Sequence, residues 1–170
     1  AAENLRNKAI TDLFEPGSTM KPLTIAAALE SGEYTVNSTI DTSPGFRRFG
    51  RFTIRDHRNY GVLDLTEIIV KSSNVGVSNI ATDLGGDTLR NLYARLGLGQ
   101  ATGIGFPGEA VGVLPAPPKW RPVEESTLSY GYGMSVNALQ LAQAYMVIAN
   151  GGVRYPLSLM KQEQRPQGQR

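Results

Sequence analysis

The nine residues EPGSTMKPL (residues 15–23) decide how this 170-residue chain is interpreted. A Pro-Gly turn precedes a serine and a lysine three positions apart, Ser18 and Lys21. On a helix, positions i and i+3 lie on the same face, about one turn apart. Two interpretations follow. Either Ser18 caps an ordinary helix and Lys21 is solvated, or Ser18 is a nucleophile whose proton Lys21 removes.

The residues that follow predict a helix from Ser18 to Leu29. Three consecutive alanines favour a helix and allow close packing, and Gly32 stands where a helix stop is expected. Pro22 is compatible with this helix because it falls in the first turn, where its missing N–H has no intrahelical partner.

Further along the chain, capping and stop signals predict more helices and little strand. The expected helices lie at 18–29, after Asp64, at 75–86, at 87–97 with Asp87 as cap, and at 136–149. Alternating polar and apolar residues at 51–55 predict one half-buried strand in a hairpin. Residues 103–122 are rich in Gly and Pro, so we expect an irregular connection there.

Composition excludes several classes of site. The chain has no cysteine, which excludes thiol catalysis, and a single histidine, which excludes a histidine-rich metal centre. A Ser-His-Asp triad would have to use His57. The net charge of +2 is too small to argue for nucleic acid or an anionic membrane as a partner. No apolar run approaches the length needed to cross a bilayer.

The chemistry available to Ser18 depends on Lys21. A serine hydroxyl is a poor nucleophile unless a base takes its proton, and a lysine can do so when its pKa is lowered toward neutrality. The positive end of a helix dipole beside the serine would favour negative charge developing on the acyl oxygen. A serine and a lysine at this spacing also occur often by chance, so the pair alone favours the capped helix.

A second polar cluster is KSSN (residues 71–74), between two expected helices. Ser72 could relay a proton to a leaving group, and Asn74 could hydrogen-bond a substrate amide. The alternative is that Ser73 or Asn74 merely caps the next helix.

Two other stretches have open interpretations. In SYGYGMS (residues 129–135), glycines alternate with Tyr130 and Tyr132, which indicates extended backbone approached closely by a ligand or packed as a turn. The arginines and phenylalanines of residues 46–58 could bind polyanions, although their strand alternation favours a solvated face.

Taken together, these motifs resemble the penicillin-binding protein family. Ser18-Thr19-Met20-Lys21 matches its Ser-x-x-Lys motif, and Ser72-Ser73-Asn74 matches its Ser-x-Asn motif. The surrounding strings ITDLFEPGSTMKPLTIAAALESG, IIVKSSNVGVSNIA, GLGQATGIGFPGE and YGYGMSVNALQLAQAY resemble the division-specific class B members. The likeness fails only in the polar tail.

The resemblance implies an α/β (α+β) transpeptidase fold and a D,D-transpeptidase that cross-links peptidoglycan stem peptides at the septum. In that family pattern Ser18 is the nucleophile, Lys21 its base, Ser72 a proton relay and Asn74 a ligand of the substrate amide. The resemblance also implies substrate-binding positions at Tyr130, Tyr132 and Glu15.

The implied partners are peptidoglycan stem peptides, beta-lactam antibiotics and cell-division proteins of the divisome. Nucleic acid is not among them, and no cofactor or metal is implied. The implied location is the periplasmic face of the inner membrane, with membrane contact only through an anchor that this segment lacks. Within the enzyme class, a beta-lactamase or D,D-carboxypeptidase is the alternative. From a different class, the alternative is a non-catalytic beta-lactam sensor or interaction module.

One family motif is not found. None of the five lysines is followed by Thr-Gly or Ser-Gly, so the third motif, Lys-Thr/Ser-Gly, is absent from these residues. We therefore expect residues 1–170 to be a partial transpeptidase domain, mostly its helical part, with most of the central antiparallel sheet missing. Such a segment alone should be poorly stable, because the helices would expose the surface that faces the sheet.

Overall fold

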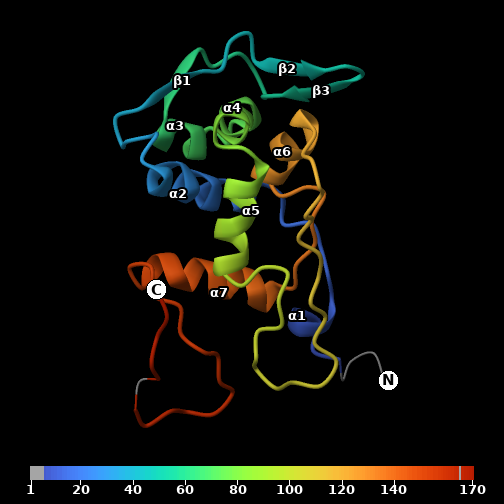
Figure 1. The fold of residues 1–170 in the computed structure, drawn as a ribbon, viewed down its shortest axis with the longest axis vertical. Helices are drawn as coiled ribbons and strands as arrows, with labels where there is room; N and C mark the ends of the chain where they lie inside the picture. The colour runs from blue at the N-terminus through green and yellow to red at the C-terminus, as the bar shows by residue number, and fades with distance from the viewer. Residues whose placement is uncertain (1–5, 165) are drawn as a thin grey trace. The chain divides into compact units, whose positions relative to one another are not determined.

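The structure, a computed structural model, describes residues 6–164 and 166–170 (Figure 1). Its helices are α1 (Lys8–Thr11), the 3-10 helix η2 (Gly17–Met20), α2 (Lys21–Ser31), α3 (Leu65–Val70), α4 (Asn74–Leu84), α5 (Gly86–Arg95), α6 (Pro122–Ser129) and α7 (Ala138–Ala149). Its strands are β1 (Thr39–Asp41), β2 (Phe46–Phe49), β3 (Phe52–Arg55) and β4 (Val62–Asp64). None of these helices is long and apolar enough to span a membrane.

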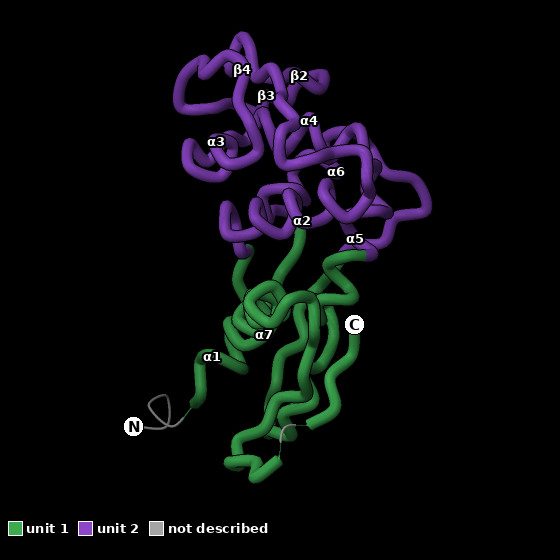
Figure 2. Tube along the Cα trace, turned by 90° about the vertical axis from the view of Figure 1, so that its left-hand side faces the viewer, with its two compact units in different colours: residues 1–15, 92–114, 134–170 green, residues 16–91, 115–133 purple. Residues whose placement is uncertain are grey.

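The chain divides into two compact units, which Figure 2 colours separately. Unit 1 comprises residues 1–15, 92–114 and 134–170, and unit 2 comprises residues 16–91 and 115–133. The Ser-x-x-Lys and Ser-x-Asn motifs both fall in unit 2. Unit 2 therefore carries the candidate chemistry.

The core of unit 2 lies among α2, α3, α4 and the β1–β4 strand pair. Its buried apolar side chains are Ile25, Ala28, Ile40, Leu63, Leu65, Ile68, Val77 and Ile80. Ala28 is fully buried on α2, and a side chain this small lets another helix approach closely. Of the three predicted alanines, Ala27 and Ala28 are buried and Ala26 is only partly so. The core holds α2 and α4, the helices that begin at the two motifs.

The strands form two separate antiparallel pairs. The predicted hairpin is confirmed: β2 pairs with β3, with Phe46 opposite Arg55 and Phe49 opposite Phe52. The other pair, β1 with β4, was not predicted, because each strand has only three residues and too short an alternation to read. Among the described residues, helical residues outnumber strand residues, as expected.

The helix expected at 18–29 begins differently from the prediction. Residues 17–20 form the 3-10 helix η2, closed by the N–H of Lys21 donating to the carbonyl of Ser18, and the α-helix starts at Lys21. Pro22 stands in the first turn of α2, as predicted. Gly32 ends the helix in the left-handed conformation, with φ of 78°, which confirms the predicted stop.

Most of the other predicted helix ends are confirmed. The capping boxes Asp64–Glu67 and Asn137–Gln140 are both formed, at α3 and α7. The expected Asp87 cap is wrong: α5 starts one residue earlier, and the Asp87 carboxylate instead accepts a hydrogen bond from Trp120 Nε1 at 2.7 Å.

Helix α6 was missed. Its start signal is Pro122 in the first turn followed by Glu124, whose carboxylate accepts a hydrogen bond from the N–H of Arg121 at 2.9 Å. The prolines just before the helix made this segment resemble an irregular connection.

Candidate active site

One cavity of unit 2 collects all four residues of the two motifs. It has a volume of about 470 Å³. Its lining residues are Ser18, Lys21, Arg55, Asp56, His57, Tyr60, Lys71, Ser72 and Asn74. Residues separated by more than 50 positions in the sequence thus share one space, as a catalytic interpretation of both motifs requires.

Ser18 and Lys21 lie at the junction of η2 and α2. In a 3-10 helix, residues i and i+3 eclipse one another, so this junction keeps the two side chains on one edge. Both line the cavity, although the α-helix does not begin at Ser18. Ser18 and Lys21 thus share one face, as expected, but a 3-10 turn places them there instead of the predicted α-helical turn.

Lys21 is buried, with only 2% of its surface exposed. Its Nζ donates to Ser72 Oγ at 2.8 Å and to the Ser72 carbonyl at 2.6 Å. A lysine head group is seldom buried to this degree without a carboxylate in contact. The solvated-lysine interpretation of the opening stretch is therefore wrong.

Burial changes the protonation of Lys21. Removal from water lowers the pKa of its ammonium group from 10.5 to about 8, and the charge of Asp56 partly opposes this shift. A pKa near 8 leaves a useful fraction of neutral amine at neutral pH. The neutral amine can accept a proton from a hydroxyl.

The KSSN loop assigns a different task to each of its polar residues. Ser73 is the N-cap of α4, and its Oγ accepts from the N–H of Gly76 at 2.8 Å. Ser72 has a φ of 54°, a left-handed conformation that is uncommon outside glycine. Asn74 donates from Nδ2 to the Arg55 carbonyl at 3.0 Å. Capping thus falls to Ser73, while Ser72 and Asn74 line the cavity.

Asp56 is a site residue that the sequence interpretation missed. Its carboxylate accepts from Ser73 Oγ at 2.6 Å and from the N–H of Val75 at 2.9 Å. These bonds fasten the KSSN loop to the end of β3. The sequence does show an acidic residue directly after the predicted strand, which could have marked Asp56 as a candidate. Nothing in the sequence links it to Ser73, 17 positions away.

The turn that carries Ser18 rests on the chain at Gly131. The N–H of Gly17 donates to the Gly131 carbonyl at 3.1 Å. A Cβ atom at Gly131 would lie 2.3 Å from the Gly17 carbonyl oxygen. The SYGYGMS stretch is therefore packed as a turn against the backbone of the Ser18 turn, which is the second of its two interpretations.

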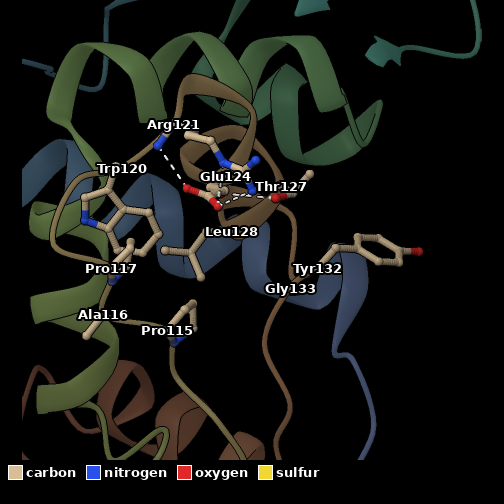
Figure 3. A pocket seen from close by; sticks show the side chains of 10 residues that line it. All are labelled: Pro115, Ala116, Pro117, Trp120, Arg121, Glu124, Thr127, Leu128, Tyr132 and Gly133. Carbon is tan, nitrogen blue, oxygen red and sulfur yellow. Dashed lines mark hydrogen bonds and ion pairs between the residues drawn. The ribbon is translucent and has the colours of Figure 1, made fainter. Parts of the chain in front are cut away.

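The structure does not bring the three other predicted residues into the cavity. Tyr130 and Tyr132 stack edge to face, with ring centroids 5.7 Å apart, and neither lines the cavity with Ser18. Tyr132 lines a second cavity of unit 2, of about 460 Å³, shared with Trp120 and the Arg121–Glu124 ion pair (Figure 3). Glu15 belongs to unit 1. Substrate contacts by these three residues stay predictions.

Two of the remaining cavity residues, His57 and Lys71, are exposed side chains. Among residues 6–164 and 166–170, no group of three or more His, Asp or Glu side chains is arranged to hold a metal ion. The two motifs contribute hydroxyl, amine and carboxamide groups to the cavity.

Known proteins resemble the chain along its whole length. The penicillin binding protein transpeptidase domain family matches residues 1–170. A probable peptidoglycan D,D-transpeptidase PenA of Neisseria gonorrhoeae is 43% identical over 169 residues, which is 99% of this chain and 29% of that protein. The peptidoglycan D,D-transpeptidase FtsI of Escherichia coli K12 is 42% identical over 168 residues, which is 99% of this chain and 28% of that protein.

A solved structure agrees with these relatives. The apo transpeptidase domain of Burkholderia pseudomallei penicillin-binding protein 3 superposes with a TM-score of 0.92 at 41% identity, and covers 98% of this chain and 51% of that one. The chain thus spans less than a third of the length of these two curated relatives and about half of the solved domain. The expected α/β fold class is confirmed, and the chain belongs to the penicillin-binding protein transpeptidase family.

Proposed function

We propose that the protein containing this chain is a serine-type D,D-transpeptidase that cross-links peptidoglycan stem peptides. The observation that carries the proposal is the buried Lys21 amine, which shares a cavity with the Ser18 hydroxyl and lies 2.8 Å from Ser72 Oγ. The names of relatives such as FtsI and PenA support the same reaction.

The first half-reaction forms an ester. Ser18 Oγ attacks the carbonyl carbon between two D-alanines while neutral Lys21 takes the hydroxyl proton. The peptide C–N bond then breaks, and the departing amine takes up a proton that passes from Lys21 through Ser72 Oγ. Terminal D-alanine leaves, and the rest of the stem peptide remains esterified to Ser18.

The second half-reaction transfers the acyl group. An amine of a second stem peptide attacks the ester carbonyl, loses a proton to the Lys21–Ser72 pair, and displaces Ser18 Oγ, which regains its proton. Asn74 hydrogen-bonds the amide of the donor peptide. The helix dipole of α2, whose positive end follows Ser18, favours the negative charge that develops on the carbonyl oxygen.

The wider context of the proposal follows the relatives. We propose that the protein acts in septal cell-wall synthesis with cell-division proteins of the divisome, at the periplasmic face of the inner membrane. Beta-lactams, which resemble the D-Ala-D-Ala terminus, would acylate Ser18 and block the reaction.

Fluorescent penicillin tests the proposal on the natural full-length protein. Wild type should acquire a covalent label that excess unlabelled beta-lactam prevents, and Ser18→Ala should not be labelled. Ser31→Ala, at the exposed end of α2, is the matched control and should be labelled like wild type. Absence of label on wild type, or label that persists in Ser18→Ala, would refute the assignment.

A further inference from the structure

The β2–β3 hairpin concentrates positive charge on a nearly neutral chain. Residues 46–58 contain five of the 17 basic residues and one of the 15 acidic residues. This segment therefore carries a charge of +4, while the rest of the chain carries −2. Such an asymmetry indicates a cationic surface, and the two faces of the hairpin show which side chains form it.

One face of the hairpin is occupied by α4. Arg47 and Ile54 are directly opposed in the antiparallel register, so they share this face. Ile54 is buried, and Arg47 Nη1 donates to the Ser78 carbonyl at 2.7 Å and to Thr82 Oγ1 at 3.1 Å. These contacts hold the hairpin on the helix.

The opposite face presents two guanidinium groups on one aromatic ring. Phe46 is opposed to Arg55, and Arg48 is two positions along the same strand, so all three side chains lie on this face. The Cζ atoms of Arg48 and Arg55 lie 5.3 Å and 5.4 Å from the centroid of the Phe46 ring. Stacking on a shared ring restricts both side chains, so less of their freedom remains to be lost on binding an anion.

Both stacked arginines are available to an external anion. Their side chains are exposed, and no carboxylate of the described residues forms a salt bridge with either. We call this surface, made of Phe46, Arg48 and Arg55, the arginine face.

The arginine face is continuous with the candidate active site through Arg55. This residue also lines the cavity that contains Ser18, and its carbonyl accepts the hydrogen bond from Asn74 Nδ2. A peptide whose reacting end occupies the cavity could therefore extend onto the hairpin.

We propose that the arginine face binds free carboxylates of an acidic peptide whose reacting end lies beside Ser18. This inference rests on the proposed function and adds a subsite to it. A guanidinium group matches a carboxylate with two parallel hydrogen bonds. Two such groups on one ring offer partners to a peptide with more than one acidic group. A nucleic acid or an anionic membrane would need a broader basic surface than these two side chains provide.

Peptide binding to full-length protein carrying Ser18→Ala tests the inference without turnover. The probes are two fluorescent peptides ending in D-Ala-D-Ala, one with two free side-chain carboxylates and one with both amidated. Fluorescence anisotropy at low salt should show about tenfold tighter binding of the acidic peptide, within the range for two exposed ion pairs. Adding Arg48→Gln and Arg55→Gln together should reduce this preference to about twofold or less.

The matched control is Arg51→Gln on the same Ser18→Ala background. Arg51 is exposed and stacks on Phe52, outside the arginine face. The preference for the acidic peptide should therefore be the same with Arg51→Gln as with Ser18→Ala alone. The inference is overturned if the acidic peptide has no advantage, or if Arg51→Gln removes the advantage as effectively as the double substitution. It is also overturned if phosphatidylglycerol vesicles or a single-stranded oligonucleotide bind the same arginines more tightly than the peptide does.

Failure of this inference is distinguishable from failure of the proposed function. Penicillin labelling of Ser18 reports the reaction alone, because a beta-lactam carries no extended acidic peptide. Normal labelling together with no acidic preference would overturn only the arginine face.

Discussion

Lys21 Nζ lies 2.8 Å from Ser72 Oγ and 2.6 Å from the Ser72 carbonyl, so the buried amine joins the first motif to the second. The two contacts hold a lysine head group away from water inside the cavity that Ser18 also lines. This relationship makes the protonation of Lys21 the quantity on which the proposed chemistry depends.

The rate of acylation should follow the deprotonation of Lys21. Burial lowers its pKa to about 8, so below that pH most of the amine is protonated and cannot accept the Ser18 proton. In the full-length protein, the acylation rate constant should rise about tenfold from pH 6 to pH 7 and level off above pH 8. Stopped-flow measurements with a chromogenic beta-lactam give this profile. A flat profile from pH 6 to 9 would remove Lys21 from the role of base.

Removing the Lys21 amine should strongly slow acylation of Ser18. Lys21→Ala should reduce the acylation rate constant at least ~100-fold, and Lys21→Arg should do the same because a guanidinium stays protonated. Lys119→Ala, an exposed lysine of the same unit, is the control and should react normally. A near-normal rate in Lys21→Ala would transfer the role of base to another group.

Asp56 should act as a positioning residue that also tunes Lys21. Asp56→Asn weakens the charge-assisted bonds to the KSSN loop and should slow acylation roughly tenfold. Its negative charge raises the pKa of Lys21, so its removal should move the midpoint of the pH–rate profile to lower pH. Asp87→Asn, an acidic residue of the same unit in contact with Trp120, should leave the midpoint unchanged. An unmoved midpoint in Asp56→Asn would limit Asp56 to a structural role.

Gly131 should be required for the position of the Ser18 turn. An alanine Cβ there would collide with the Gly17 backbone, while at Gly133 the nearest atom is Thr127 Oγ1 at 3.9 Å. Both glycines have positive φ, so Gly133→Ala controls for the backbone strain that the two substitutions share. Gly131→Ala should lower the free energy of unfolding by about 1–3 kcal/mol more than Gly133→Ala, and should slow acylation. Equal losses in a chemical denaturation series would contradict this packing.

Much of this site could be predicted because its signals are local. Ser18 and Lys21 are three positions apart, and Ser72 and Asn74 are two apart, so each motif is legible within a single turn or loop. Gly32 and the Asn137–Gln140 capping box are equally local, since a left-handed stop or a cap involves only neighbouring residues.

The parts that sequence reasoning missed depend on contacts between distant residues. The bond from Ser73 to Asp56 spans 17 positions, and the contact between Gly17 and Gly131 spans more than 100. The 3-10 geometry of residues 17–20 arises where a Gly-led turn meets a proline-bearing helix start, and periodicity alone does not distinguish it from an α-helical turn. The placement of Tyr132 and Trp120 on the lining of one cavity depends on α6, which the prolines before it concealed.

Peptide mapping by mass spectrometry tests the central claim most directly. The full-length protein is incubated with a beta-lactam at pH 8, digested, and searched for the covalent adduct. The proposed mechanism predicts stoichiometric modification of Ser18 alone, lost in Ser18→Ala and strongly slowed in Lys21→Ala. An adduct on Ser72 or Ser73, or an unmodified protein, would contradict the assignment of Ser18 as the nucleophile and Lys21 as its base.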